Sequence, residues 1–211
     1  MHAGVWQKAA VVRAAGAFQR MYCAYYLSET PLCVSPQQEK KAMIREILTY
    51  PDRRLAIECE EIEEITDEIR QLAADMAETM YDADGIGLAA PQVGATCRLI
   101  VVDVSGPEAR EDLRTYINPR LELLEGKVDT EEGCLSVPAL RSKVTRTEKV
   151  RLHATDLDGN AVCIDADGLL SICLQHEIDH LDGTLFIDKI SRLKRSLYDN
   201  KVKKWQKRAK N

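Results

Sequence analysis

Residues 175–180 read Gln-His-Glu-Ile-Asp-His. His176 and His180 are four residues apart, so an α-helix places both imidazoles on one face, where they can bind a single metal ion. Glu177 stands beside the first histidine and would flank whatever the metal holds. This stretch therefore predicts a metal-binding helix and the chemistry of a hydrolase.

The histidine pair lacks one ligand, because a catalytic divalent metal usually takes three protein ligands and keeps one position open. Position 186 is a phenylalanine where one class of zinc peptidase has a third histidine, and residues 181–211 contain no glutamate. The best upstream candidate is Cys134, since a thiolate is a strong ligand and the preceding Gly133 lets backbone approach closely. The alternatives are Cys173, Cys163 and His153. Of these, Cys173 is better explained as a small core residue.

Length and composition describe a single globular domain. The chain has 211 residues, of which 45% are hydrophobic, enough for one domain with a core. Seven cysteines without paired spacing argue against a disulfide framework and favour a reducing compartment, so we expect the cytoplasm. No apolar run approaches the roughly 20 residues that cross a bilayer, and we expect no membrane association.

Charge divides the chain into three parts. Residues 1–42 carry five basic and two acidic residues and show no clear period, so we expect a poorly ordered extension. This extension would result from a start assigned ahead of Met43, or would be a transit peptide that makes the location organellar. Residues 43–188 carry 14 basic and 31 acidic residues and form the expected folded domain, whereas residues 189–211 carry ten basic residues and one acidic residue. This basic end could bind a polyanion.

Hydrophobic periodicity predicts the helices. One helix is expected to begin with Thr66 as its cap and to run to about Asp82. The histidine-bearing helix is expected at 167–182, ended by Gly183 in a left-handed conformation. A last helix is expected at 189–209, with one broad apolar face made of Ile190, Leu193, Leu197, Val202 and Trp205.

Most of the middle of the chain is predicted to be strand and turn. A short apolar run predicts a buried strand at 99–102. Alternating residues predict a second strand at 144–156, which an Asp158-Gly159 turn joins to a third at 161–164.

A glycine-rich segment, residues 85–92, reads Gly-Ile-Gly-Leu-Ala-Ala-Pro-Gln. Its glycines fit a dinucleotide-binding fingerprint, but that fingerprint needs a strand before it and a helix within it, and here a helix precedes and Pro91 follows. We therefore expect no dinucleotide. Beside a metal site, the same segment would let an extended peptide lie against the backbone while the Gln92 amide donates a hydrogen bond to a carbonyl.

Together, the segments GIGLAAPQ, EEGCLS and QHEIDH resemble the three motifs of peptide deformylases, most closely the bacterial type 1 enzymes. The resemblance runs from about Met43 to the C-terminus, which makes residues 43–188 the catalytic domain. It implies an α+β fold in which antiparallel β-sheets pack around a central metal-binding helix, with a C-terminal helix after it. It also implies a metal-dependent hydrolase that removes the formyl group from N-terminal formylmethionine of newly synthesised polypeptides and releases formate.

The resemblance assigns roles to individual residues. The metal ligands would be Cys134, His176 and His180, with water in the fourth position. Glu177 would be the general base and acid, and the Gln92 amide with the Leu135 backbone N–H would bind the oxyanion. The peptide would lie along Ile86, Gly87 and Gly133. An apolar pocket for methionine would be expected near the metal, with Ile86, Leu169, Ile172 and Cys173 as candidates for its wall.

The remaining expectations concern the ion, the partners and the alternatives. The resemblance implies iron(II), although a Cys-His-His site also suits zinc, and Ni²⁺ or Co²⁺ could substitute. The basic C-terminal helix resembles the extension through which bacterial deformylases reach the ribosome. Arg141 or Arg146 could hold Asp179 as a brace behind the metal. Two other functions stay open: a metallopeptidase with altered specificity, and a closed structural zinc site on a ribosome-binding module.

Overall fold

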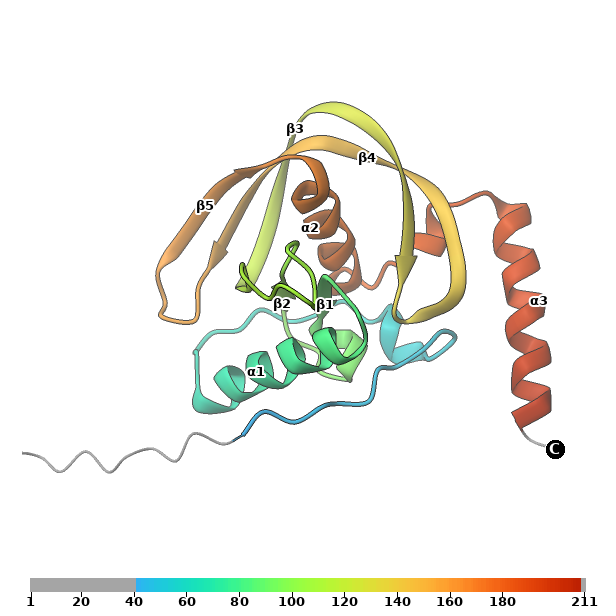
Figure 1. The fold of residues 1–211 in the computed structure, drawn as a ribbon, viewed down its shortest axis with the longest axis horizontal. Coiled ribbons are helices and arrows are strands. Elements are labelled where there is room, and N and C mark those ends of the chain that lie inside the picture. Colours follow the sequence, from blue (N-terminus) through green and yellow to red (C-terminus); the bar gives the residue numbers. More distant parts are fainter. Residues whose placement is uncertain (1–40, 210–211) are drawn as a thin grey trace, which may run out of the picture. The chain divides into compact units, whose positions relative to one another are not determined.

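The computed structural model describes residues 41–209 and arranges them as one antiparallel sheet with three α-helices (Figure 1). The predictions made for residues 1–40 lie outside the described residues. The strands are β1 (Gly87–Ala89), β2 (Leu99–Val102), β3 (Arg114–Cys134), β4 (Val137–Thr155) and β5 (Ala161–Ala166). The α-helices are α1 (Asp67–Asp82), α2 (Gly168–Leu181) and α3 (Arg192–Ala209), and three short 3-10 helices are η1 (Arg53–Ala56), η2 (Ala90–Val93) and η3 (Phe186–Asp188).

The sheet follows chain order, β1-β2-β3-β4-β5, and every neighbouring pair is antiparallel. Strands β3 and β4 form a long curved hairpin that arches over α2 (Figure 1). The register of this hairpin shifts at three places, the last of them between Glu132 and Cys134, where the strand enters the tight turn at Leu135 and Ser136. The predicted α+β architecture is confirmed.

Helix α2 is the buried centre of the fold. Its Cys173, Leu174, Ile178 and Leu181 pack in one cluster with sheet residues that include Ile100, Val150 and Leu152. A helix that is apolar on most sides is expected to be covered on most sides. The predicted end is confirmed, because Gly183 has φ +67° and its N–H donates to the His180 carbonyl at 3.2 Å. A Cβ at this glycine would come within 2.9 Å of the Ala56 backbone.

Helix α1 packs against β1 and β2. It begins and ends where the sequence predicts. Its apolar stripe of Leu72, Ala73, Met76 and Met80 packs on β1 and β2. The prediction of a Thr66 cap is right for the backbone position and wrong for the side chain, which makes no capping hydrogen bond. None of the described helices has the length and apolar character needed to span a membrane.

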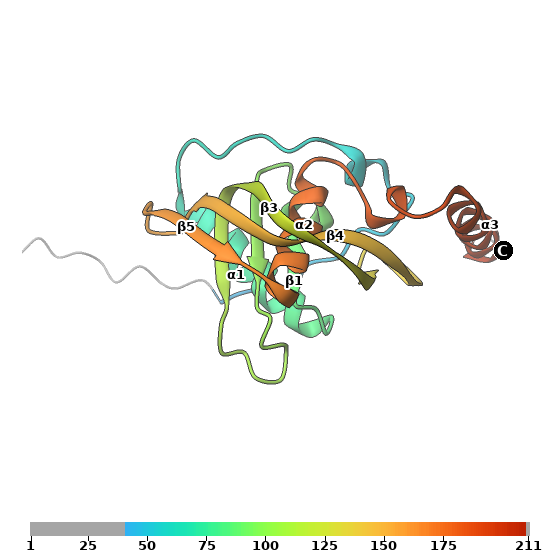
Figure 2. The same cartoon turned by 90° about the horizontal axis from the view of Figure 1, so that it is seen from above.

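Helix α3 lies beside the end of the hairpin at which β3 turns into β4 (Figures 1 and 2). Two residues of the predicted apolar face, Leu193 and Leu197, are 71% and 62% exposed. Tyr198 and Val202 are buried instead, in one cluster with Val137, Phe186 and Ile187. The helix begins at Arg192 and not at residue 189, so Ile190 precedes it. The buried side of α3 includes a tyrosine that the predicted apolar face did not contain.

Candidate metal centre

Helix α2 and the end of β3 bring three metal-binding side chains together. One donor atom from each of Cys134, His176 and His180 lies within 4.8 Å of the other two. The Cys134 Sγ and His180 Nε2 atoms are 3.2 Å apart, and the two imidazole centroids are 5.1 Å apart. Four-residue spacing puts the histidines on one helical face, and Cys134, the last residue of β3, brings the thiol to them.

No fourth histidine, cysteine or acid of residues 41–209 joins this group. The other ligands considered from sequence lie elsewhere: the Cys173 thiol donates to the Ile86 carbonyl at 3.6 Å, Cys163 is exposed on β5, and the exposed His153 is 3.8 Å from Glu122. A three-donor set of one sulfur and two nitrogens matches the open type of catalytic site, which leaves a position for a small ligand.

Two buried polar atoms at this centre have no hydrogen-bond partner, namely Glu177 Oε2 and His180 Nδ1. Such atoms are costly to bury and mark a place where a ligand, ion or water belongs. Burial raises the pKa of the Glu177 carboxyl to about 7 and lowers the pKa of His180 well below its usual value. Neutral imidazole is the form that binds a metal, so the environment of His180 favours coordination.

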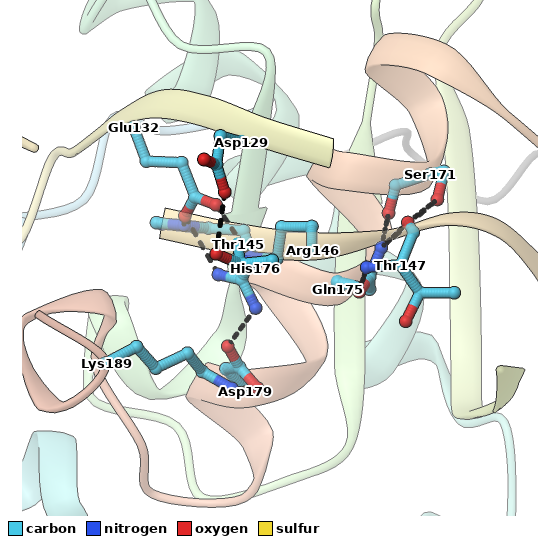
Figure 3. A network of polar contacts seen from close by, with 10 residues as sticks. All are labelled: Asp129, Glu132, Thr145, Arg146, Thr147, Ser171, Gln175, His176, Asp179 and Lys189. Atoms are coloured by element: carbon cyan, nitrogen blue, oxygen red, sulfur yellow. Dashed lines mark hydrogen bonds and ion pairs between the residues drawn. The ribbon is translucent and has the colours of Figure 1, made fainter. Parts of the chain in front are cut away.

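A chain of charged groups supports His176 from behind (Figure 3). Its Nδ1 atom lies 2.9 Å from Glu132 Oε2, so that Nδ1–H donates to the carboxylate and Nε2 is left to face the other donors. Arg146 donates to both oxygens of Glu132, at 2.6 and 2.8 Å, and to Asp179 Oδ2 at 2.6 Å. Lys189 completes the chain, 3.0 Å from Asp179 Oδ1.

This network of hydrogen bonds and ion pairs keeps the Glu132 carboxyl ionised. Burial alone would raise its pKa, but hydrogen bonds from Arg146 and His176 lower the pKa to about 2. The contact between Arg146 and Asp179 was predicted as one of two options, whereas Arg141 lines the cavity instead. Sequence reasoning missed Glu132. The available signal was its position two residues before Cys134, because alternate residues of an extended strand point to the same side.

A cavity of about 850 Å³ opens beside the three donors. The residues expected along the peptide, Ile86, Gly87 and Gly133, line it, and so do Gln92, Leu135 and Glu177. The four expected wall residues of an apolar pocket, Ile86, Leu169, Ile172 and Cys173, line the same cavity. Segments far apart in sequence thus meet around one cavity, whose lining also includes Cys134 and His176.

The Gln92 side chain is buried and anchored at both ends. Its Oε1 accepts from the Ala89 N–H at 2.8 Å, while its Nε2 donates to Ser136 Oγ at 3.1 Å and points to Cys134 Sγ at 3.6 Å. The amide orientation follows from these partners. The side chain therefore presents N–H groups, not its oxygen, to the metal-binding side of the cavity.

Comparison with known proteins identifies the family. A family model described as polypeptide deformylase matches residues 44–196, more than half of the chain. The chain belongs to the peptide deformylase family. The peptide deformylase of Acinetobacter baumannii (strain SDF) is 52% identical over 159 residues, which span 75% of this chain and 89% of that protein. Peptide deformylase 2 of Nitrosomonas europaea is 50% identical over 165 residues, or 78% of this chain and 88% of that protein.

Solved deformylase structures share the fold. The enzyme from Legionella pneumophila superposes with a TM-score of 0.74 at 42% identity and covers 80% of this chain and 98% of its own. The enzyme from Ehrlichia chaffeensis, solved in complex with actinonin, gives a TM-score of 0.72 at 40% identity and covers 77% and 97%. The chain is therefore a metal-dependent hydrolase that removes the N-formyl group of newly synthesised polypeptides and releases formate.

Gly87 tests how tightly the deformylase site is packed. A Cβ at this position would lie 2.5 Å from Glu177 Oε1 and 2.7 Å from Cys173 Sγ, both on buried side chains. We expect Gly87→Ala to displace Glu177, to lower kcat/KM by about 100-fold and to destabilise the fold by about 1–3 kcal/mol. Steady-state kinetics and urea unfolding measure the two effects.

Gly133→Ala is the matched control for stability, because its Cβ would meet the nearest atom, Arg141 Cγ, at an ordinary 3.5 Å. Its free energy of unfolding should stay within about 1 kcal/mol of wild type. Wild-type kinetics in Gly87→Ala would show that Glu177 has more room than the structure gives it.

Proposed function

We propose that Cys134 Sγ, His176 Nε2 and His180 Nε2 hold the deformylase's divalent metal and that the adjacent cavity receives the formylated end of the peptide. The juxtaposition of three donors with the unpartnered, buried Oε2 of Glu177 carries this proposal. When bound, such a metal lowers the pKa of a water molecule toward about 7 and polarises a carbonyl oxygen. The retained base beside it argues against a closed structural zinc site.

Glu177 is the proton carrier in this proposal. Its Oε2 has no partner, and burial raises its pKa to about 7, which is suitable for a group that both accepts and returns a proton near neutral pH. Glu177 Oε2 accepts the proton of the attacking water as the formyl carbon is attacked. The same oxygen then gives that proton to the amine nitrogen as the carbon–nitrogen bond breaks, so formate and a free N-terminus leave.

Gln92 and the Leu135 backbone N–H stabilise the charge that develops on the formyl oxygen. Gln92 Nε2 is held next to Cys134 Sγ by the Ala89 N–H and Ser136, so the donor is in position before the reaction. Leu135 lies in the turn directly after Cys134 and lines the same cavity. Preorganised donors are effective because they need no reorientation as the charge forms.

The peptide lies along Ile86, Gly87 and Gly133, with its methionine side chain in the apolar part of the cavity. Ile172 and Cys173 of α2, together with Ile86, provide apolar lining there. The absence of a side chain at Gly87 lets backbone approach Glu177 closely. A nascent chain that carries formylmethionine fits these features.

Iron(II) is the proposed native ion, and zinc, nickel or cobalt would substitute, because thiolate and imidazole donors accept all of these metals. The deciding experiment is formate release from formyl-Met-Ala-Ser by protein prepared without oxygen and loaded with each metal in turn. We expect one ion per chain, activity with iron(II), and loss of the iron activity in air.

Cys134→Ser is the matched variant, since it keeps the size of the side chain and removes the thiolate. It should lower metal content and activity together. Full activity without a divalent ion, or full metal content in Cys134→Ser, would contradict the proposed ligand set.

We also propose that the outer face of α3 contacts the ribosome. Three exposed lysines, Lys203, Lys204 and Lys207, are available for phosphate groups. Replacing all three by glutamine should weaken ribosome binding and flatten its salt dependence, while formate release from a tripeptide stays unchanged. Co-sedimentation at several salt concentrations measures the binding. Glutamine at Lys127, Lys143 and Lys149, three exposed lysines outside α3, is the charge-matched control, and equal loss in both variants would remove the role of α3.

The cytoplasm is the proposed location. The five cysteines among the described residues are free thiols, which suits a reducing compartment, and the substrate is a nascent chain. Fractionation of the native cell tests this location directly.

A further inference from the structure

The turn between β3 and β4 forms part of the cavity wall. Directly after Cys134, the chain passes through Leu135 and Ser136 into β4, and Val137, Ala139, Leu140 and Arg141 of that strand line the cavity. Ala139 has φ +56°, a left-handed conformation that costs energy for a residue with a Cβ. Such a conformation persists when neighbouring groups hold it in place.

Helix α3 supplies contacts to the outer side of this wall. The Tyr198 hydroxyl donates to the Pro138 carbonyl at 3.0 Å, and Lys201 Nζ donates to the Ala139 carbonyl at 3.3 Å. One turn earlier, Lys194 Nζ donates to Ser142 Oγ at 3.1 Å. The carbonyl groups on both sides of the strained Cα are thus bound by one helix.

Packing reinforces these hydrogen bonds. Tyr198 and Val202 are 3% and 5% exposed and share a cluster with Val137 of the wall. Tyr50 connects the β3–β4 turn to α3. Its N–H donates to the Ser136 carbonyl and its hydroxyl donates to Asp199 Oδ1, each at 2.8 Å. A helix with only a docking role would not need to bury a tyrosine hydroxyl against the backbone of the cavity wall.

We propose that α3 is a working part of the peptide-binding site, in which Tyr198 acts as a positioning residue for the wall segment 137–141. This inference rests on the proposed binding of the peptide in the cavity. The methionine side chain is assigned to a part of the cavity lined by Ile86 and α2, so the wall segment is left to contact the residues that follow methionine. Loosening α3 should therefore weaken binding of longer peptides and leave the chemical step alone.

The test uses Tyr198→Phe alone and combined with Lys201→Met in the full chain. Phenylalanine keeps the ring in its cluster and removes the hydrogen bond to Pro138. The expected result is a KM for formyl-Met-Ala-Ser that rises about three- to tenfold at unchanged kcat, the scale of one or two lost hydrogen bonds. The KM for formyl-methionine amide, which lacks the following residues, should not change.

Amide hydrogen exchange gives a second readout that does not depend on activity. Backbone amides of 139–142 should exchange faster in both variants. Leu197→Ala is the matched control, since this side chain lies on the same helix and is 62% exposed. It should match wild type in both measurements.

Each outcome distinguishes the two proposals. Wild-type exchange at 139–142 in the double variant would overturn the positioning role. An equal fall in kcat for both substrates without a change in KM would also overturn it, because that result would mean only a loss of folded enzyme. A wild-type protein that releases no formate with any metal would instead overturn the proposed function, while the exchange experiment would still decide whether α3 holds the wall.

Discussion

Glu177→Gln is expected to slow formate release by about 100- to 10,000-fold, the usual contribution of a positioned general base. Glutamine has nearly the same shape as glutamate but cannot accept the proton that Glu177 Oε2 takes in the proposed reaction. Metal content should stay at one ion per chain because Glu177 is not among the three donors. Single-turnover kinetics on metal-loaded protein separates the chemical step from binding. Glu63→Gln, an exposed glutamate far along the chain, is the control.

The same substitution should stabilise the metal-free protein. Burial raises the folded-state pKa of Glu177 from 4.5 to about 7, so the folded state binds this proton more tightly than the unfolded state does. The contribution of Glu177 to stability is therefore fully present below pH 4.5 and is lost as the pH rises toward 7. At pH 8 the wild type must bury a charge, and Glu177→Gln should be more stable by about 3 kcal/mol at most.

Urea unfolding in the presence of a chelator measures this difference at pH 5 and pH 8. The gain should be large at pH 8 and small at pH 5. An unchanged or reduced stability at pH 8 would mean that the carboxylate has a partner in solution. Activity with a wild-type rate in Glu177→Gln would mean that another group moves the proton. Glu177 would then be a residue that lowers stability and is retained because the reaction needs it, as is common in active sites.

Local features of this fold could be predicted from sequence, and features that depend on distant partners could not. The helix carrying His176 and His180, its end at Gly183, and the Asp158-Gly159 turn each follow from a few neighbouring residues. Strand β3 was missed because most of residues 118–131 are exposed and carry no apolar alternation, so only pairing with β4 fixes them as strand. The metal ligands were found because spacing and chemistry restrict them.

The groups that support the site were harder to recognise. Glu132 appears in the sequence as one acid among many, and only the fold shows that it lies between His176 and Arg146. Tyr198 on α3 was missed in the same way. The apolar pattern pointed to Leu197, but Leu197 is exposed and Tyr198 is buried. Both residues are buried polar groups whose partners come from other elements, and pattern reasoning on one element does not contain that information.

Arg146→Met should have the largest effect on stability. Arg146 is the cation that binds both buried Glu132 and Asp179, with side-chain exposures of 3%, 5% and 19% for the three residues. Removing one partner of a buried ion pair typically costs about 3–5 kcal/mol, because the other charge is left without compensation. Lys149→Met is the matched control. It breaks an exposed pair with Glu125 at a similar 2.8 Å, and such a pair contributes less than about 1 kcal/mol.

Arg146→Met should also lower the affinity for the metal, because Arg146 supports His176 through Glu132. Without Arg146, the Glu132 carboxyl loses the hydrogen bonds that hold its pKa near 2, so it holds a proton over part of the range in which it is now charged. A protonated Glu132 no longer accepts the Nδ1–H bond as a carboxylate does, and the imidazole becomes a weaker and less oriented ligand. We expect metal affinity to fall about 10- to 100-fold, measured by competition with a chelator at pH 7.

The pH dependence distinguishes this route from a general loss of folding. In wild type, the contribution of Glu132 to stability is present above about pH 4.5 and is lost as the pH falls toward 2. Arg146→Met should move this loss to higher pH, so that metal release on acidification begins earlier than in wild type. Glu132→Gln removes the titrating group and should lower the affinity without that shift. If Arg146→Met binds metal as wild type does at every pH, His176 does not depend on the chain of charges behind it.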